Sequence, residues 1–523
     1  MSKERKATRK PLSFSTTLRN PERIAGFLNC ILPFEGQILT NEIIHEVAVN
    51  LIAGKFYYTQ MYEMKVPEYK VIYNDSDLSF TREQVEDIIK HSPQNHKEAG
   101  FDKGWPSRFD TWYEFPQELG FIRYEIGKPI VISQTGHMLV DAFNEEIVNN
   151  DKIQAVFLNA LMKYQTNNPF KKNLNANSPL ILTLKVLDEL KRINKESAGI
   201  HRQEISLIIC WPNDDHIELV DKIIALRSKY GFSISNEVIY GECMELLEAG
   251  KDKENLFKMS KITDEAVDEF IRKMRITGVF SLRGNGRFLD LNQYEITTIK
   301  YILSNYSSSV SFEDKDSYFG YISAIDPNIF SSIKSTAVDK LEAKELSVIK
   351  WAEVFSQKEV EKELSLLCKN SKSNNDILRV IDAPTRFEFL TSISLKQHFK
   401  ELRVIPNYKV DDEGLPTFTA AGGIGDIECF DKDCKPIVEV TLMTSKAQGV
   451  NEIPAITRHI LDRQEKYPTD KIFAVFIAPS IHADAKYMIG FSKYQLDVDI
   501  LPYTILEYIS KIANCSRIQE MKY

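Results

Sequence analysis

One change of pattern constrains the fold of this chain of 523 residues more than any other feature. Before the segment NSKSNND (370–376), apolar residues recur mostly at helical spacing. After it, short apolar runs such as KIFAVFIAP alternate with helical stretches, which is typical of an α/β domain. The segment itself is polar and contains no apolar residue, so we predict a domain boundary there.

The C-terminal part, 377–523, is predicted to be a small α/β domain with a mixed sheet. Its first helix is expected near 384–400, followed by a strand around 403–408. A hairpin formed by IECF and PIVEVTL comes next, and then a helix at 451–466. The apolar run KIFAVFIAP is expected to form a buried strand after that helix.

Two stretches in the N-terminal part, 105–139 and 264–291, share one pattern of a helix followed by a tight hairpin. This order is the sequence shape of a winged-helix unit. Arg108 lies in the first helix, and Arg283 and Arg287 flank the Gly284-Asn285-Gly286 turn of the second hairpin. We interpret these arginines as DNA contacts of a wing or groove, the alternative being an ordinary surface hairpin with solubilising arginines.

The length of the chain agrees with three or four domains at about 150 residues each. We therefore expect a recognition region at 1–290 made of two subdomains, about 1–145 and 146–290. A helical linker at 291–376 follows, because this part is mostly helical and poor in glycine.

Charge is distributed unevenly along the chain. The net charge of −8 and the pI of about 5.8 on their own argue against a nucleic-acid partner. However, residues 1–25 contain seven Lys/Arg, Arg19 and Arg23 among them, against two acidic residues. This segment is either a solvated tail or a basic arm on a phosphate backbone. Residues 380–450 contain eleven Asp/Glu against eight Lys/Arg, which suits a carboxylate cluster that holds metal ions.

Several classes of protein are disfavoured by composition. No uncharged apolar stretch approaches the roughly 18 residues that span a membrane, and no apolar region typical of a secretory signal follows the basic start. Seven scattered cysteines suit a reducing compartment, so we expect a cytoplasmic protein. No phosphate-binding loop or Gly-x-Ser-x-Gly motif occurs in the sequence.

Two carboxylates in the C-terminal part carry the strongest chemical signal. Asp426 follows a glycine-rich loop, and Glu439 lies thirteen residues later inside the apolar strand PIVEVTL. A buried carboxylate needs compensation, either by an arginine or by a cation. Two carboxylates on adjacent strands of a hairpin can share one Mg²⁺ ion, which suits phosphodiester hydrolysis.

Further acidic residues lie nearby in the sequence. Glu452 and His459, with Arg463, are spaced to lie on one face of the helix at 451–466. Glu388 stands between Phe387 and Phe389, so a partly apolar setting is expected. For each acid taken singly, a salt bridge or a charge at a helix start is the simpler explanation.

Three segments resemble one known family: SFSTTLRNPERI (13–24), FSLRGNGRFLDLN (280–292) and the block 420–459. The sequence resembles the AlwI-type (type IIS) restriction endonucleases and their strand-nicking relatives. The resemblance implies winged-helix-like recognition units, a helical linker and a C-terminal nuclease domain of the PD-(D/E)xK type.

The same resemblance assigns the catalytic residues. It matches Asp426 and Glu439 to the two motif acids, Glu388 and Glu452 to two further active-site glutamates, and His459 to a histidine beside the site. Asp426, Glu439 and Glu388 are expected to hold Mg²⁺. The motif lysine is replaced by Thr441, and Lys446, Glu452 and His459 are the candidates for its role.

We therefore expect a Mg²⁺-dependent type IIS endonuclease that binds a short asymmetric sequence in double-stranded DNA. It would cut a few base pairs away and leave 5′-phosphate ends. One alternative is a strand-specific nicking enzyme, the large subunit of a heterodimer; another is a winged-helix regulator without catalysis. Cutting both strands would need a transient homodimer or a small nuclease subunit.

Overall fold

The computed structural model of the chain describes residues 9–75, 77–145, 148–249, 257–306, 309–332, 341–420 and 423–522. It divides into two compact units. Unit 1 comprises Met1–Lys65, Phe80–Asn144 and Asp151–Thr336, and unit 2 comprises Val66–Ser79, Glu145–Asn150 and Ala337–Tyr523. The basic residues Lys3, Arg5 and Lys6 of the expected arm lie outside the described residues.

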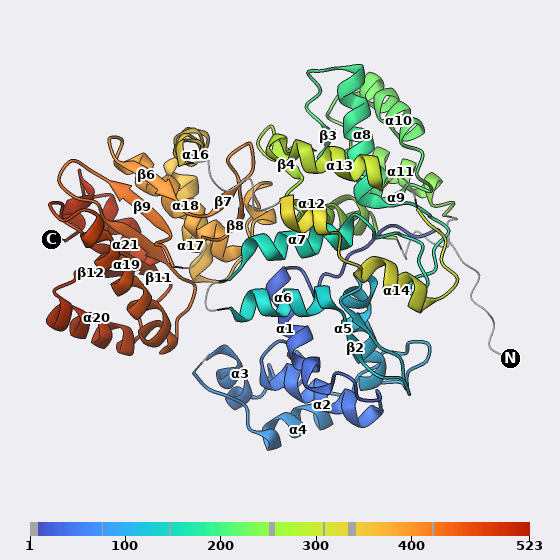
Figure 1. Cartoon of the computed structure of the whole chain (residues 1–523), viewed down its shortest axis with the longest axis horizontal. Coiled ribbons are helices and arrows are strands. Elements are labelled where there is room, and N and C mark those ends of the chain that lie inside the picture. The colour runs from blue at the N-terminus through green and yellow to red at the C-terminus, as the bar shows by residue number, and fades with distance from the viewer. Residues whose placement is uncertain are drawn as a thin grey trace. The chain divides into compact units, whose positions relative to one another are not determined.

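Unit 1 is mainly helical (Figure 1). Its first half contains α1 (Pro21–Ile31), α2 (Asn41–Ala53), α4 (Arg82–His91), α5 (Trp105–Glu118), β1 (Ile122–Arg123), β2 (Val131–Ile132) and α6 (Gln134–Asn144). Its second half contains α7 (Asn150–Leu161), α8 (Pro179–Ile193), β3 (Ile200–His201), α9 (Ile205–Cys210), α10 (His216–Tyr230), α11 (Asn236–Leu246), α12 (Ala266–Ile276), β4 (Phe280–Arg283), β5 (Phe288–Leu291), α13 (Ile296–Asn305), α14 (Lys315–Ser323) and α15 (Pro327–Ser332).

Both expected helix–hairpin stretches are present in unit 1. Helix α5 precedes the antiparallel pair β1–β2, and Ile38 adds a bridge to Pro129 beside that pair. Helix α12 precedes the antiparallel pair β4–β5, and β3 completes a sheet of order β3-β5-β4. The turn between β4 and β5 has three consecutive residues with positive φ, Gly284, Asn285 and Gly286, which explains its Gly-Asn-Gly sequence.

Unit 2 contains a mixed five-stranded sheet of order β12-β11-β10-β9-β6. Its elements are α3 (Pro67–Asn74), α16 (Leu341–Val354), α17 (Gln357–Cys368), α18 (Ala383–His398), β6 (Arg403–Pro406), β7 (Lys409–Val410), β8 (Pro416–Phe418), β9 (Ile427–Phe430), β10 (Ile437–Val440), the π-helix η8 (Gln448–Glu452), α19 (Ile453–Lys466), β11 (Ala474–Ala478), α20 (Ala483–Leu496), β12 (Ile500–Thr504) and α21 (Ile505–Ile512). Strand β9 is antiparallel to both of its neighbours, β6 and β10. Strand β11 is parallel to both of its neighbours, β10 and β12. The expected mixed α/β architecture is therefore confirmed.

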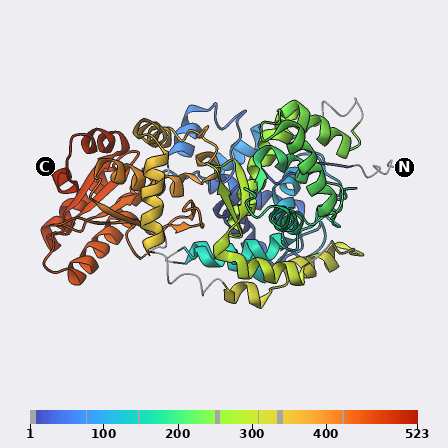
Figure 2. The ribbon, with the colours of Figure 1, turned by 90° about the horizontal axis from the view of Figure 1, so that it is seen from above.

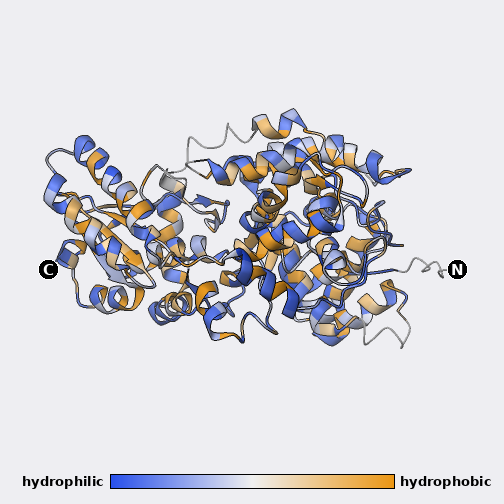
Figure 3. Cartoon of the chain, turned by 90° about the horizontal axis from the view of Figure 1, so that it is seen from below, coloured by the Kyte–Doolittle hydropathy of each residue, from blue (hydrophilic) through white to orange (hydrophobic). Residues whose placement is uncertain are grey.

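Apolar packing on the sheet positions the helices that carry the acidic residues. Strands β10, β11 and β12 share one buried cluster with α19 and α20, to which α19 contributes Ile453, Ile456 and Ile460. Helices flank the strands on both sides in Figure 2, and apolar residues run along the strands in Figure 3. This packing holds the start of α19 close to the end of β10.

Helices α16 and α17, which were expected in a linker, belong to unit 2. The Trp351 and Phe355 rings lie 6.2 and 6.3 Å from the ring of Phe389 in α18. Segment 370–376, expected as a boundary, is a loop within unit 2 between α17 and α18. The division into functional parts at 290 and 376 stays a prediction.

Candidate functional site

Asp426, directly before strand β9, lies next to Glu439 on strand β10. The two strands are antiparallel, with Val438 paired to Ile427, so the next pair along the hairpin is Glu439 and Asp426. The Asp426 backbone N–H donates to Glu439 Oε2 at 3.2 Å, and the Val440 N–H donates to Asp426 Oδ2 at 2.9 Å. These two hydrogen bonds hold both carboxylates together at the open end of the β9–β10 hairpin.

Gly425 provides the space that this pair of acids needs. A Cβ atom at residue 425 would lie 2.9 Å from Glu439 Oε1 and 3.3 Å from Ile437 Cβ. A side chain there would therefore push the Glu439 carboxylate away. The expected site did not include this residue, although the glycine-rich run before Asp426 was a signal for it.

Glu388 reaches the same site from helix α18. Its side chain is buried, and its Oε2 accepts a hydrogen bond from the Ala420 N–H at 2.9 Å. The charges of Asp426 and Glu439 both act on Glu388. The prediction from its flanking phenylalanines, that Glu388 has a partly apolar setting, is confirmed.

Glu452 and His459 reach the site from η8 and α19. The Thr441 hydroxyl donates to Glu452 Oε1 at 3.2 Å, and His459 Nδ1 lies 2.8 Å from Glu439 Oε1. The structure therefore brings Glu452 next to Thr441, the residue expected at the position of the motif lysine. Lys446 is exposed, and its backbone N–H donates to Asp77 Oδ2 at 2.8 Å.

Arg463, spaced to share a helical face with Glu452 and His459, faces other partners. Its guanidinium is buried, pairs with Glu428, and donates to the carbonyl oxygens of Lys435 at 2.7 Å and Cys429 at 3.1 Å. It therefore holds α19 against the outer part of the β9–β10 hairpin and leaves the acidic residues of the site without its charge.

The pKa values of all four acids are raised, because the protein buries them close to one another. Burial raises the pKa of Glu439 to about 8, and the charge of Glu452 acts in the same direction. Burial raises the pKa of Asp426, which keeps part of its surface exposed, and so does the charge of Glu439. Burial likewise raises the pKa of Glu388 and Glu452, and it lowers the pKa of His459.

Such a cluster needs either protons or a cation to neutralise it. Its carboxylate oxygens are the hard ligands that Mg²⁺ prefers. The side-chain positions in the described ranges do not converge as three or more His, Cys, Asp or Glu ligands around one ion. The carboxylates are instead engaged with backbone N–H groups, the Thr441 hydroxyl and His459.

Three of the expected DNA-contacting arginines meet in unit 1. Arg19, Arg23 and Arg108 line one groove of about 640 Å³, which we call the basic groove. Its other lining residues are Thr16, Thr17, Asn20, Tyr57, Tyr58 and Gln60. The C-terminal part of the expected basic arm, which carries Arg19 and Arg23, therefore lines a concave surface together with residues 57–60 and helix α5.

The other two arginines differ from each other. Arg283 Nε donates to the buried Asp290 Oδ2 at 2.6 Å, and its guanidinium also donates to the Leu291 carbonyl at 2.9 Å. Arg287 is exposed at the turn, where its Nε donates to the Gly284 carbonyl at 3.0 Å. Arg283 thus braces the β4–β5 hairpin, whereas Arg287 presents its charge outward.

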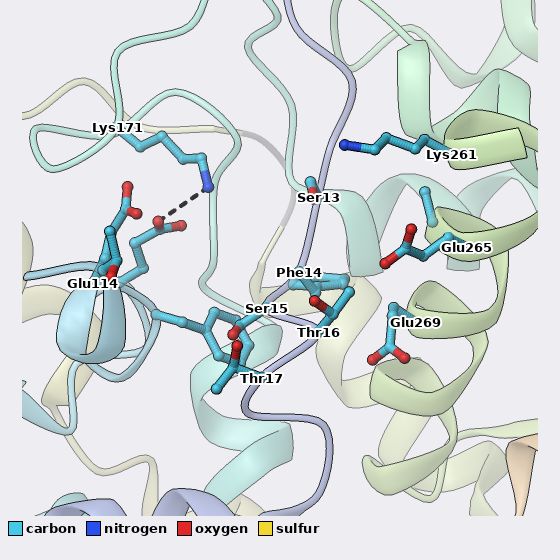
Figure 4. A pocket seen from close by; sticks show the side chains of 14 residues that line it. Ser13, Phe14, Ser15, Thr16, Thr17, Glu114, Lys171, Lys261, Glu265 and Glu269 are labelled. Atoms are coloured by element: carbon cyan, nitrogen blue, oxygen red, sulfur yellow. Dashed lines mark hydrogen bonds and ion pairs between the residues drawn. The ribbon is translucent and has the colours of Figure 1, made fainter. Parts of the chain in front are cut away.

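The segment before the basic groove runs between two helices. Residues 13–17 pass between α5, which carries Glu114, and the helical segment that carries Lys261, Glu265 and Glu269 (Figure 4). Arg19 Nε pairs with Glu269 at 3.0 Å, and the Lys273 ammonium donates to the carbonyl oxygens of Leu18 and Arg19. These contacts fix the backbone that presents Arg19 to the groove.

Among the described residues, no helix is both long enough and apolar enough to cross a membrane. No curated protein sequence matches the chain.

Three solved structures show similarity to the chain. The small subunit of the heterodimeric restriction endonuclease R.BspD6I is 22% identical over 29% of this chain and 76% of its own, with a TM-score of 0.24. The BpuJ1 endonuclease binding domain, in complex with modified DNA, is 14% identical over 61% of this chain and 98% of its own, with a TM-score of 0.34. Restriction endonuclease FokI bound to DNA is 10% identical over 98% of both chains, with a TM-score of 0.25. These TM-scores are low, so we take no structural detail of this chain from these proteins.

The family comparison is more extensive. The sequence model described as AlwI restriction endonuclease matches residues 117–342 and 320–510. The two matches overlap and together span most of the chain, including Glu388, Asp426 and Glu439. The chain therefore belongs to the AlwI restriction endonuclease family.

Proposed function

We propose that this protein is a type IIS restriction endonuclease. It binds a short asymmetric sequence in double-stranded DNA and hydrolyses phosphodiester bonds a few base pairs outside it. Membership of the family makes the chain a nuclease that acts on DNA. The observation that carries the reaction is the cluster of Glu388, Asp426, Glu439 and Glu452 around the edge of the β9–β10 hairpin.

The cluster fits a divalent cation, and Mg²⁺ is the cofactor we propose. Asp426, Glu439 and Glu388 would hold it, since each is an oxygen donor whose pKa is raised by burial. When bound, Mg²⁺ would stabilise negative charge on the phosphate and lower the pKa of a water molecule. Attack of that water on phosphorus, with the 3′ oxygen as the leaving group, would give the 5′-phosphate and 3′-hydroxyl ends that we propose. We expect nuclease residues of the PD-(D/E)xK type in 377–523.

Glu452 is the residue that we propose in the role of the motif lysine. Thr441 occupies the lysine position, and its hydroxyl holds the Glu452 carboxylate at 3.2 Å. Burial raises the pKa of Glu452, which makes its carboxylate a stronger base for the proton of an attacking water. His459 orients the Glu439 carboxylate through its 2.8 Å contact.

Residues 1–290 form the proposed recognition region, and 291–376 link it to the nuclease part. Helix α12 followed by the sheet β3-β5-β4 has the strand order of a winged-helix unit, and α5 with β1–β2 and the Ile38 bridge repeats it. These subdomains, about 1–145 and 146–290, present Arg19, Arg23 and Arg108 in the basic groove. Arg283 and Arg287 flank the turn of the second hairpin.

A strand-specific nicking enzyme is the second candidate. The described part of the chain carries one cluster of this kind, which serves one strand at a time. Cutting both strands requires a second nuclease domain, from a transient homodimer or from a small subunit. A regulator without catalysis leaves the buried acidic cluster without a role, so we disfavour it.

Plasmid cleavage tests the proposal. Wild-type protein is incubated with supercoiled DNA and Mg²⁺, and the ends are sequenced to give the site, the offset and the number of strands cut. Asp426→Ala and Glu439→Ala are expected to lower the cleavage rate by about 10³-fold or more, because each removes a metal ligand. Binding measured in Ca²⁺ should be retained by both variants.

Glu465→Gln is the matched control, since Glu465 is an exposed acid of α19 outside the cluster. It is expected to cut like the wild type. Undiminished cutting by Asp426→Ala or Glu439→Ala would contradict the assignment of the site. Undiminished cutting in EDTA would contradict the metal requirement.

A further inference from the structure

The basic groove has the chemistry of a site for an acceptor-rich ligand. Three arginines line it together with hydroxyl and amide side chains, and no aspartate or glutamate is among its lining residues. This sets it apart from the neighbouring pocket along residues 13–17, which four glutamates line together with two lysines: Glu114, Glu118, Glu265, Glu269, Lys171 and Lys261 (Figure 4). The groove is thus the part of this surface suited to nucleic acid.

Arg108 is held in the groove by two aromatic rings and a histidine. Its guanidinium carbon lies 5.1 Å from the ring centre of Tyr57 and 5.7 Å from that of Trp112. One of its terminal N–H groups contacts His96 Nε2 at 2.9 Å. Burial, followed by the charge of Arg108, lowers the pKa of His96, so the imidazole is neutral and its Nε2 accepts this hydrogen bond.

Arg108 differs from Arg19 and Arg283 in having no acidic partner within the described part of the chain. Arg19 pairs with Glu269, and Arg283 pairs with Asp290. Arg108 is held by aromatic rings and a neutral imidazole, which orient the plane of its guanidinium without neutralising its charge. An oriented and charged guanidinium is a bidentate donor ready for a flat acceptor pair.

The position of Arg108 in the fold indicates which acceptors it meets. It is the fourth residue of α5, the helix that directly precedes the β1–β2 hairpin. In helix-turn-helix proteins the first residues of the recognition helix contact base edges in the major groove. Guanine is the base whose major-groove edge presents two adjacent acceptors, O6 and N7, to an arginine fork.

We infer that Arg108 determines sequence specificity by donating two hydrogen bonds to one guanine of the recognition sequence. Arg19 and Arg23, on the segment beside it, contact the phosphates that flank this base. The inference rests on the proposed function, since it assigns a base contact to the proposed recognition region. A phosphate contact by Arg108 itself is the competing outcome.

Binding to modified duplexes tests this assignment. The recognition sequence is first obtained from the sequenced cleavage ends, and affinity is then measured in Ca²⁺ on duplexes in which each guanine in turn is replaced by 7-deazaguanine. One replacement is expected to weaken wild-type binding by about 10-fold or more, because it removes the N7 acceptor. Arg108→Ala and Arg108→Lys should weaken binding to the unmodified duplex by about 10- to 100-fold. Both variants should then be insensitive to that one replacement.

Non-specific DNA separates base contact from phosphate contact. Under the inference, Arg108→Lys binds non-specific duplex like the wild type. A different result would make Arg108 a phosphate contact and overturn the inference. In that case Arg108→Ala loses the same affinity on specific and non-specific duplex, Arg108→Lys restores it, and the slope of log affinity against log salt concentration falls by about one in Arg108→Ala. Wild-type binding that is unaffected by every guanine replacement would overturn it as well.

Controls distinguish this result from misfolding and from failure of the proposed function. Lys90→Ala, at an exposed lysine of α4, should leave affinity and specificity unchanged. Thermal unfolding shows whether Arg108→Lys keeps the fold. Absence of site-specific cleavage by the wild type would overturn the proposed function and the inference together. If the wild type cleaves at a specific site and Arg108→Lys cleaves there with the same preference, the inference alone is overturned.

Discussion

At the scale of single residues, the candidate site depends on a glycine as much as on its acids. Gly425→Ala places a methyl group 2.9 Å from Glu439 Oε1, which is closer than these two atoms can pack. Because a misplacement of about 1 Å can cost 100-fold in rate, we expect cleavage to fall by roughly that factor. Stability should fall less, since the end of the glutamate side chain can move. Gly490→Ala in α20 is the control, because a Cβ there meets no atom within 4 Å.

Single-turnover cleavage rates at saturating Mg²⁺ and DNA measure the effect of Gly425→Ala. A rate for this variant equal to that of Gly490→Ala would show that the Glu439 carboxylate does not need its present position.

Glu439 also predicts how stability depends on pH. Burial raises its pKa to about 8, whereas the unfolded chain has the ordinary value of 4.5. The folded protein therefore holds a proton that the unfolded chain has released between these values. The stabilising contribution is fully present below about pH 4.5 and is lost as the pH rises through about 8. In EDTA we expect the free energy of unfolding to fall with pH over this window more steeply in the wild type than in Glu439→Gln.

Chemical denaturation at several pH values from 5 to about 8.5 measures this difference, which should reach roughly 3 kcal/mol. Comparing the two proteins cancels the ionisable groups that do not contact Glu439. Superimposable pH profiles would contradict the raised pKa. Addition of Ca²⁺ should stabilise the wild type more at the upper end of the range, because cation binding releases the proton.

At the scale of elements, α12 is anchored on the segment before α1 through a buried lysine. Lys273 donates to the Leu18 carbonyl at 3.3 Å and to the Arg19 carbonyl at 2.5 Å, and it lies 3.7 Å from Glu269. Lys273→Met leaves these acceptors buried without their shared cation. We expect the variant to lose about 2–4 kcal/mol of stability and to bind DNA more weakly, because Arg19 loses its fixed backbone.

Urea denaturation and DNA binding in Ca²⁺ measure both effects of Lys273→Met. Lys300→Met, at an exposed lysine of α13, controls for the loss of a positive charge and should change stability by less than about 0.5 kcal/mol. Stability and binding that match this control would mean that α12 does not depend on the contact.

The elements also separate what local pattern predicts from what it does not. Helix α18 was expected at 384–400 and found at 383–398, and the strand expected at 403–408 is β6. Both depend on spacing between near neighbours in the sequence. The packing of α16 and α17 on α18 was not expected, because contacts such as that of Trp351 with Phe389 join residues far apart in the chain.

At the scale of the whole molecule, the number of nuclease centres predicts the order of products. Under the proposed function, the one acidic cluster in the described part of the chain would cut one strand per encounter. With supercoiled plasmid in excess, nicked circles should therefore form first, at a rate proportional to protein concentration. Linear DNA should appear later, and only when a second copy or a small subunit supplies the other centre.

Gel analysis of a time course at several protein concentrations gives both rates. If the rate of linear DNA formation rises more steeply than in proportion to the protein concentration, a second copy of this chain supplies the other centre. Linear DNA that forms as fast as nicked DNA at the lowest concentration, with no nicked intermediate, would contradict the single-centre mechanism.

The sequence by itself determined the order of the C-terminal elements, and it predicted which acids would form the candidate site. Asp426 and Glu439 were recognisable because a tight hairpin brings two residues into contact that are only thirteen positions apart in the sequence. The alternation of side chains along each strand is also a local property. The tertiary structure alone decided that Arg463 faces Glu428, that Arg283 braces its own hairpin and that Arg108 lies over the rings of Tyr57 and Trp112. These outcomes depend on how distant elements pack, since a side chain's partner is set by the surface that folding brings against it and not by its sequence neighbours.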